Sequence, residues 1–201
     1  MIAKGIEKYA RAIKKSEITF KTAKKLKDIC DDYNIEFYCS AFYPEAVMYL
    51  ESLNVKKYKI ASRTCLLKDP FSKETLKCVA KTKKPTIISM GMGGNKKYIK
   101  KIFSKNKMTF CYCISEYPLL FQKINWKDAI QFSGFSDHTL GVAAPIIYTT
   151  LKKYQGSKNI MIEKHIKLKN SKGPDAPSSM NTEEFSKMVK SIRLIENSKL
   201  D

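Results

Sequence analysis

The sequence lacks the segments that would place it in or across a membrane. Its apolar runs are short, so no stretch of about 20 residues could span a bilayer as a helix. The first 17 residues carry charges throughout and contain no apolar stretch typical of a signal peptide. We therefore predict a cytoplasmic protein with no membrane partner.

Cysteine is present, but not in the pattern of a zinc site. No two of the six cysteines form a CxxC pair, which argues against a structural zinc ion. Most of them lie inside apolar segments, and nothing marks the chain as secreted, so we predict reduced, buried thiols. They are Cys30, Cys39, Cys65, Cys78, Cys111 and Cys113.

Acidic residues are scarce relative to basic ones. Lys and Arg number 38 against 19 Asp and Glu, which gives a net charge of +19. Such a balance is compatible with binding of polyanions. However, the lysines are scattered along the chain, and no nucleic-acid-binding motif accompanies them. We do not expect a nucleic-acid partner, although a positive field would attract small phosphorylated anions.

Apolar residues make up 43% of the chain. Over most of its length, short apolar segments that predict strands alternate with segments whose apolar spacing predicts helices. The predicted strands are Ile35–Cys39, Tyr58–Ser62, Thr86–Ser89, Met108–Cys113, Ile130–Ser136 and Asn159–His165. The predicted helices are Glu45–Leu53, Ser72–Lys81, Lys97–Phe103, Gly141–Lys153 and a last helix that starts at Asn181 with Glu184 as its capping-box partner. This alternation predicts an α/β fold with a parallel sheet, and a doubly wound sheet and a (β/α)₈ barrel both fit it.

Nearly every predicted strand ends in a polar residue, which favours the barrel. In a barrel of parallel strands these residues would gather at one mouth, where barrel enzymes place their chemistry. A doubly wound nucleotide-binding fold should instead carry a glycine-rich loop after its first strand. The segment 91–94 is the only candidate, and its spacing does not match. The polar strand ends are Ser40, Ser62, Ser89, Ser115, Ser136 and His165.

The chain has only two histidines, and each lies at or just after the end of a predicted strand. If the two strands are neighbours in one barrel, the imidazoles of His138 and His165 converge above its mouth. Two neutral imidazoles with open remaining positions suit a catalytic divalent metal ion.

The motifs around these histidines resemble those of the sialic acid synthase family. They are Phe-Ser-Asp-His-Thr-Leu-Gly at 135–141, Ile-Glu-Lys-His at 162–165, and Gly-Pro-Asp at 173–175 followed by Ser-Ser-Met at 178–180. Upstream, Tyr-Lys-Ile-Ala-Ser at 58–62, Ile-Ser-Met-Gly-Met at 88–92 and Ser-Glu-Tyr-Pro at 115–118 continue the same order. The resemblance runs from about residue 18 to about residue 195.

The resemblance implies a (β/α)₈ barrel enzyme that condenses phosphoenolpyruvate with an N-acetylated amino sugar such as N-acetylmannosamine. The products are a nine-carbon 2-keto sugar acid and phosphate, and relatives form dimers. The family's first two strands and its C-terminal antifreeze-like domain have no counterpart here. We therefore expect a helical lead-in segment over 1–17 and a partial barrel over 18–201, truncated at both ends.

The resemblance also assigns roles to individual residues. It implies that His138 and His165 bind Mn²⁺ or Mg²⁺, with Glu163 as a further catalytic residue. Tyr117 and Asp175 match positions that contact the amino sugar. The positions that match the family's phosphoenolpyruvate site are Ser40, Lys59, Ser62, Ser89, Ser115 and Ser136.

Other functions remain open at this point. The chain could be a catalytically inactive remnant of such a synthase, or a basic polyanion-binding protein. A related 3-deoxy sugar acid synthase is a weaker alternative, because the Ser-Glu-Tyr-Pro and Gly-Pro-Asp motifs argue against it.

Overall fold

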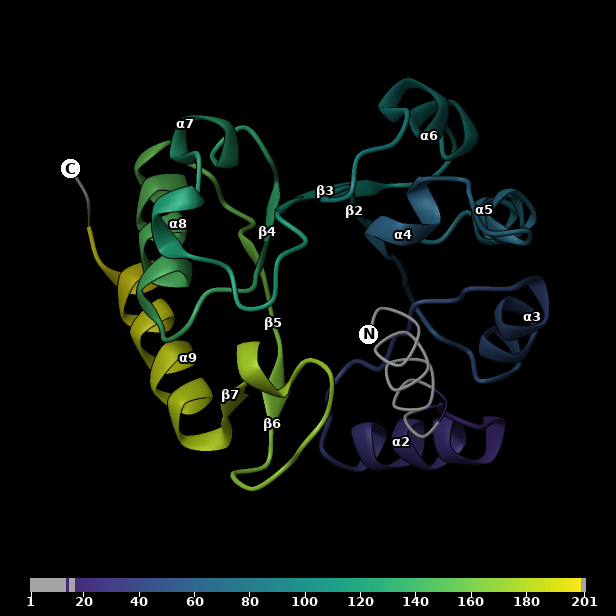
Figure 1. Ribbon diagram of the computed structural model, residues 1–201, viewed down its shortest axis with the longest axis horizontal. Coiled ribbons are helices and arrows are strands. Elements are labelled where there is room, and N and C mark those ends of the chain that lie inside the picture. Colours follow the sequence, from purple (N-terminus) through teal and green to yellow (C-terminus); the bar gives the residue numbers. More distant parts are fainter. Residues whose placement is uncertain (1–13, 15–16, 200–201) are drawn as a thin grey trace, which may run out of the picture. The chain divides into compact units, whose positions relative to one another are not determined.

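The protein is described by a computed structural model that covers Lys14 and residues 17–199. The chain forms two compact units. The N-terminal unit comprises Ile18–Cys111, and the C-terminal unit continues from Tyr112. Figure 1 follows the chain from purple at the first described helix to yellow at the last.

Parallel strands flanked by helices build the N-terminal unit. Strand β1 (Tyr58–Ile60) pairs with β2 (Thr86–Ser89), which pairs with β3 (Met108–Cys113). The last two residues of β3 belong to the C-terminal unit. The helices are α2 (Phe20–Asp32), α3 (Pro44–Ser52), α4 (Ser62–Cys65), α5 (Ser72–Lys81) and α6 (Lys96–Ile102).

The core of this unit forms where β1 and β2 meet the apolar faces of α3 and α5. Leu76 and Val79, three residues apart on one face of α5, are fully buried there. Tyr58 is also buried, and its hydroxyl donates to Glu51 Oε1 at 2.7 Å. The buried hydroxyl therefore has the partner that it needs.

The C-terminal unit has its own parallel strands and helices. Strand β4 (Gly134–Asp137) pairs with β5 (Met161–Lys164), and β6 (Ile166–Lys167) pairs with β7 (Met180–Asn181). The other elements are η1 (Phe121–Lys123), α7 (Trp126–Ala129), α8 (Ala143–Tyr154), η2 (Ala176–Ser178) and α9 (Thr182–Asn197). Helices α8 and α9 pack against each other, and α8 also contacts β4 (Figure 1).

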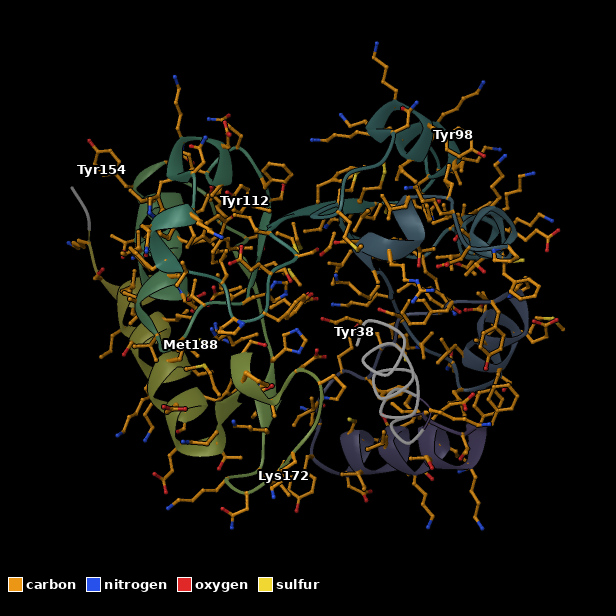
Figure 2. The ribbon with its side chains drawn as sticks, viewed as in Figure 1. Tyr38, Tyr98, Tyr112, Tyr154, Lys172 and Met188 are labelled. Carbon is orange, nitrogen blue, oxygen red and sulfur yellow. The ribbon has the colours of Figure 1, made fainter. Side chains whose placement is uncertain are left out.

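Aromatic rings form much of the core of the C-terminal unit. Phe135 of β4 stacks on Tyr148 of α8 with ring centroids 4.9 Å apart. Tyr112, labelled in Figure 2, stacks on the same phenylalanine at 5.9 Å. This packing puts one face of β4 against the helices, so the other face is left for polar side chains.

The last helix confirms the prediction made from its N-terminal residues. Asn181 accepts from the backbone N–H of Glu184, and the Glu184 side chain accepts from that of Asn181, which forms the predicted capping box. Met188, labelled in Figure 2, is buried within the apolar stripe of α9. At the other end, Lys153 of α8 donates to the carbonyl oxygens of Ile195 at 2.5 Å and Glu196 at 2.7 Å.

The α/β class and the parallel pairing of the strands agree with prediction, but one predicted strand was wrong and another was right only in its second half. The segment 35–39 forms no strand, because the chain there makes only one ladder bridge, at Ser40 to Lys59. The segment 130–133 forms turns after α7, and β4 begins only at Gly134. The short helices α4 and α7 were not predicted.

The cysteines are less buried than predicted. Cys65 and Cys111 are buried, whereas the other four are of intermediate exposure. Within the described residues, no helix is long and apolar enough to cross a membrane. Residues 1–13 and 15–16 of the predicted lead-in segment lie outside the described residues, so its boundary with the domain over 18–201 stays a prediction.

Candidate functional site

The two histidine motifs lie side by side because β4 and β5 pair in parallel. The register sets Phe135 opposite Ile162, Ser136 opposite Glu163, and Asp137 opposite Lys164. Each strand ends at the last of these pairs, and a histidine follows directly on each. The two motifs are therefore matched residue by residue across the ladder.

This register brings the imidazoles together. The ring centroids of His138 and His165 are 5.3 Å apart, with an angle of 49° between the ring planes. Tyr117 lies against both rings, 4.1 Å from the centroid of His138 and 5.7 Å from that of His165. The two histidines and the tyrosine thus form one aromatic cluster.

His138 is held in a defined orientation. It is 2% exposed, and its Nδ1 lies 2.7 Å from the carbonyl oxygen of Ile114. A carbonyl oxygen only accepts, so Nδ1 donates this hydrogen bond and Nε2 is the nitrogen left for another partner. Burial lowers the pKa of His138, and the hydrogen bond to Ile114 opposes this shift only in part. Metal ions bind the neutral form of imidazole, which burial favours.

Ser136 and Glu163 occupy the same face of the ladder as the histidines, two residues before each of them. Side chains alternate between faces along a strand, so Ser136 and His138 point to the same side. The Ser136 hydroxyl donates to Glu163 Oε1 at 2.5 Å. This bond joins the two strands and orients the carboxylate.

Asp175 approaches the cluster from the segment after β6. Its Oδ2 lies 3.8 Å from His165 Nδ1, which is too long for a hydrogen bond. Its side chain is 57% exposed. Ser115, which follows β3, is of intermediate exposure.

The residue types and spacing at the histidines fit a divalent metal ion. Metal–nitrogen distances of about 2.0–2.1 Å allow two imidazoles on one ion to have ring centroids up to roughly 6.5 Å apart. The separation of 5.3 Å is within that limit. The Nδ1–H bond to Ile114 is the arrangement that metal-binding histidines use to fix their free nitrogen. Among the described residues, no group of three or more His, Cys, Asp or Glu side chains is arranged to hold a metal ion.

The N-terminal unit holds the other predicted residues. Lys59 is 8% exposed, and its ammonium donates to Ser89 Oγ at 2.6 Å. Ser62 is also buried, and its hydroxyl accepts from the backbone N–H of Gly91 at 2.9 Å. Ser40 bridges to Lys59 in the backbone ladder. A buried ammonium with hydroxyl groups around it is a suitable environment for an anion.

Two features of the histidine site were not predicted from the sequence. One is the Ile114 carbonyl, because a backbone acceptor has no signature in the sequence. The other is an ion pair between Asp137 and Lys164. Aligning the two motifs position by position would have revealed it, since each residue occupies the third position of its motif.

Comparison with known proteins agrees with the motifs. The model of the NeuB family matches residues 3–200, so the chain belongs to the NeuB family. The N,N'-diacetyllegionaminic acid synthase of Legionella pneumophila is 31% identical over 84% of this chain and 49% of its own length. The pseudaminic acid synthase of Campylobacter jejuni is 30% identical over 80% of this chain and 47% of its own.

A solved structure shares the fold. The N-acetylneuraminic acid (sialic acid) synthetase of Leptospira borgpetersenii superposes with a TM-score of 0.80 at 25% identity. The match covers 95% of this chain and 69% of that one. The resemblance read from the sequence is thereby confirmed at the level of the family. The chain spans about half the length of the curated relatives named above.

Proposed function

We propose that the chain takes part in a sialic acid synthase-type condensation of phosphoenolpyruvate with an N-acetylated amino sugar. In this reaction the alkene carbon of phosphoenolpyruvate forms a bond with the aldehyde carbon of the open-chain sugar. Water adds to the neighbouring carbon, and phosphate leaves. The observation that carries the proposal is the pairing of two histidine-terminated motifs of this family at the ends of adjacent strands.

We propose that His138 and His165 bind Mn²⁺ or Mg²⁺. When bound, such an ion polarises a carbonyl group as a Lewis acid. The bond from His138 to Ile114 supports this role, because it orients the ring before an ion arrives and leaves Nε2 as the nitrogen available to the ion.

The proposed role of Glu163 is to accept a proton from water or a substrate hydroxyl. Its hydrogen bond with Ser136 holds the carboxylate on the face of the ladder that carries the histidines. A general base must be fixed within hydrogen-bond reach of the proton that it removes. Tyr117 and Asp175, which lie beside the histidines, are the proposed contacts of the amino sugar.

The proposed binding group for phosphoenolpyruvate is built around Lys59. Its buried ammonium would pair with the phosphate or carboxylate, since a desolvated cation binds an anion more strongly than an exposed one. Ser62 and Ser89 would add hydroxyl groups, and Ser40 and Ser115 match the same family site. The chain has a net charge of +19, and this positive charge would raise the local concentration of phosphoenolpyruvate.

The test is phosphate release from phosphoenolpyruvate with Mn²⁺ and a series of N-acetylated hexosamines. The wild-type chain is compared with H138A, H165A and the control R193M, which alters an exposed ion pair on α9. We expect release in the wild type and in R193M, and at most a trace in the histidine variants. Equal release in all four proteins would refute the assignment of the histidines.

Absence of release in the wild type with every sugar would favour the inactive-remnant alternative. The polyanion-binding alternative has a separate test. It predicts affinity for nucleic acid that falls steeply as salt is raised.

A further inference from the structure

The ion pair between Asp137 and Lys164 lies directly before the two histidines. Lys164 Nζ is 2.6 Å from Asp137 Oδ2, and both side chains are 0% exposed. The two residues form the last pair of the β4–β5 ladder, and His138 and His165 follow them. Because side chains alternate along a strand, the ion pair lies on the opposite face of the ladder from Ser136 and the histidines.

Both members of the pair also hold the residue that follows His138. Asp137 Oδ1 accepts from the backbone N–H of Thr139 at 2.9 Å, and its Oδ2 lies 3.1 Å from the Thr139 hydroxyl. Lys164 donates to the carbonyl oxygen of Thr139. Lys164 therefore ties the residue after His138 to β5, in addition to the backbone ladder and the Ser136–Glu163 bond.

Stability alone does not account for this arrangement. Removing two charges from water is costly, and replacing a buried ion pair by apolar residues is often neutral or stabilising. The contacts instead restrain the position of one strand end relative to the other, and that distance sets the separation of the two imidazoles.

We infer that the Asp137–Lys164 ion pair is a positioning device, which keeps the imidazoles of His138 and His165 at the separation that one metal ion requires. Neither residue touches the substrate or the ion. The inference rests on the proposed function, because it takes the histidines as the metal ligands.

The test uses the full chain with D137N/K164M. This variant removes both charges and the tie to β5, while Asn at 137 keeps an acceptor for the Thr139 N–H and a partner for its hydroxyl. The first measurement is the ¹⁵N spectrum of the imidazoles without metal, which contains signals from only two histidines. The second is Mn²⁺ affinity by calorimetry. The control is R193M/E196Q, which removes an exposed ion pair of the same 2.6 Å length on α9.

In the wild type and the control, we expect His138 to show one tautomer, protonated at Nδ1. In D137N/K164M we expect imidazole ¹⁵N chemical shifts that are averaged between the two tautomers. We also expect the Kd for Mn²⁺ to be about 10–100-fold higher, as when other residues that orient metal ligands are removed. If the variant is not folded in buffer, all three proteins are compared in the same concentration of sucrose, which favours compact states.

The outcomes separate the inference from the proposed function. Imidazole spectra that are identical in the wild type and in folded D137N/K164M would overturn the positioning role, whatever the metal affinity. Altered imidazole spectra in a chain whose wild type binds no Mn²⁺ would support the positioning role and refute the metal site. Altered spectra together with weaker Mn²⁺ binding would support both.

Discussion

Replacing Lys164 by methionine removes the ammonium from the buried pair while keeping most of the length of the side chain. Asp137 keeps its contacts with the Thr139 N–H at 2.9 Å and the Thr139 hydroxyl at 3.1 Å, but it loses the cation at 2.6 Å. Since the Asp137 side chain is 0% exposed, solvent cannot replace the lost charge. The folded state of K164M therefore contains a buried carboxylate with no counter-charge at this position.

Removing one partner of a buried ion pair costs about 3–5 kcal/mol of folding free energy. The two remaining contacts to Thr139 put K164M at the lower end, about 3 kcal/mol. In a chain of this size 1 kcal/mol corresponds to roughly 2–4 °C, so Tm should fall by about 6–12 °C. D137N/K164M carries neither charge and should cost only about 1 kcal/mol.

The assay is urea unfolding followed by circular dichroism, with thermal melts of the same proteins. R193M is the matched single-charge control, and it should stay within about 0.5 kcal/mol of wild type because its ion pair is exposed. The reasoning would be refuted if K164M lost less than about 1 kcal/mol. It would also be refuted if D137N/K164M lost as much as K164M, since the cost would then not arise from an unpaired charge.

Three further predictions concern other parts of the chain. H138A and H165A should each weaken Mn²⁺ binding, measured by calorimetry. The loss should exceed the roughly 10–100-fold expected when a residue that only orients a metal ligand is removed. Wild-type affinity in either variant would contradict the metal site. K153M should lower the free energy of unfolding in urea by about 2 kcal/mol, because the Lys153 ammonium binds carbonyl oxygens at the C-terminus of α9. K152M loses a 3.0 Å bond to one carbonyl oxygen and should cost about half as much. Equal costs for the two variants would argue against a stabilising role of Lys153 at the end of α9. Burial raises the pKa of Cys65 to about 11, so only about 0.1% of this thiol is ionised at pH 8. Iodoacetamide should modify Cys65 slowly in the folded chain, faster as the pH approaches 11 and much faster in urea, and equal rates in the folded and unfolded chain at pH 8 would contradict the burial.

Local patterns were enough to predict many of the elements. The alternation of apolar strands with amphipathic helices predicted the parallel sheet, because that order requires crossover connections. Asn181 and Glu184 predicted the start of α9, because a capping box involves only residues three apart. The strand predicted over 35–39 was wrong because its apolar residues satisfy the local pattern, yet only Ser40 is bridged to β1.

By itself, the sequence determined the family, the two histidines and their places after two strands. These follow from the order of residues along the chain, which motifs record directly. The partners of those histidines were decided only by the tertiary structure. Lys164 lies 27 positions from Asp137, and Ile114 lies 24 from His138. Contacts over such separations depend on the register of β4 with β5 and on the path of the chain after β3, and both arise only when the unit folds.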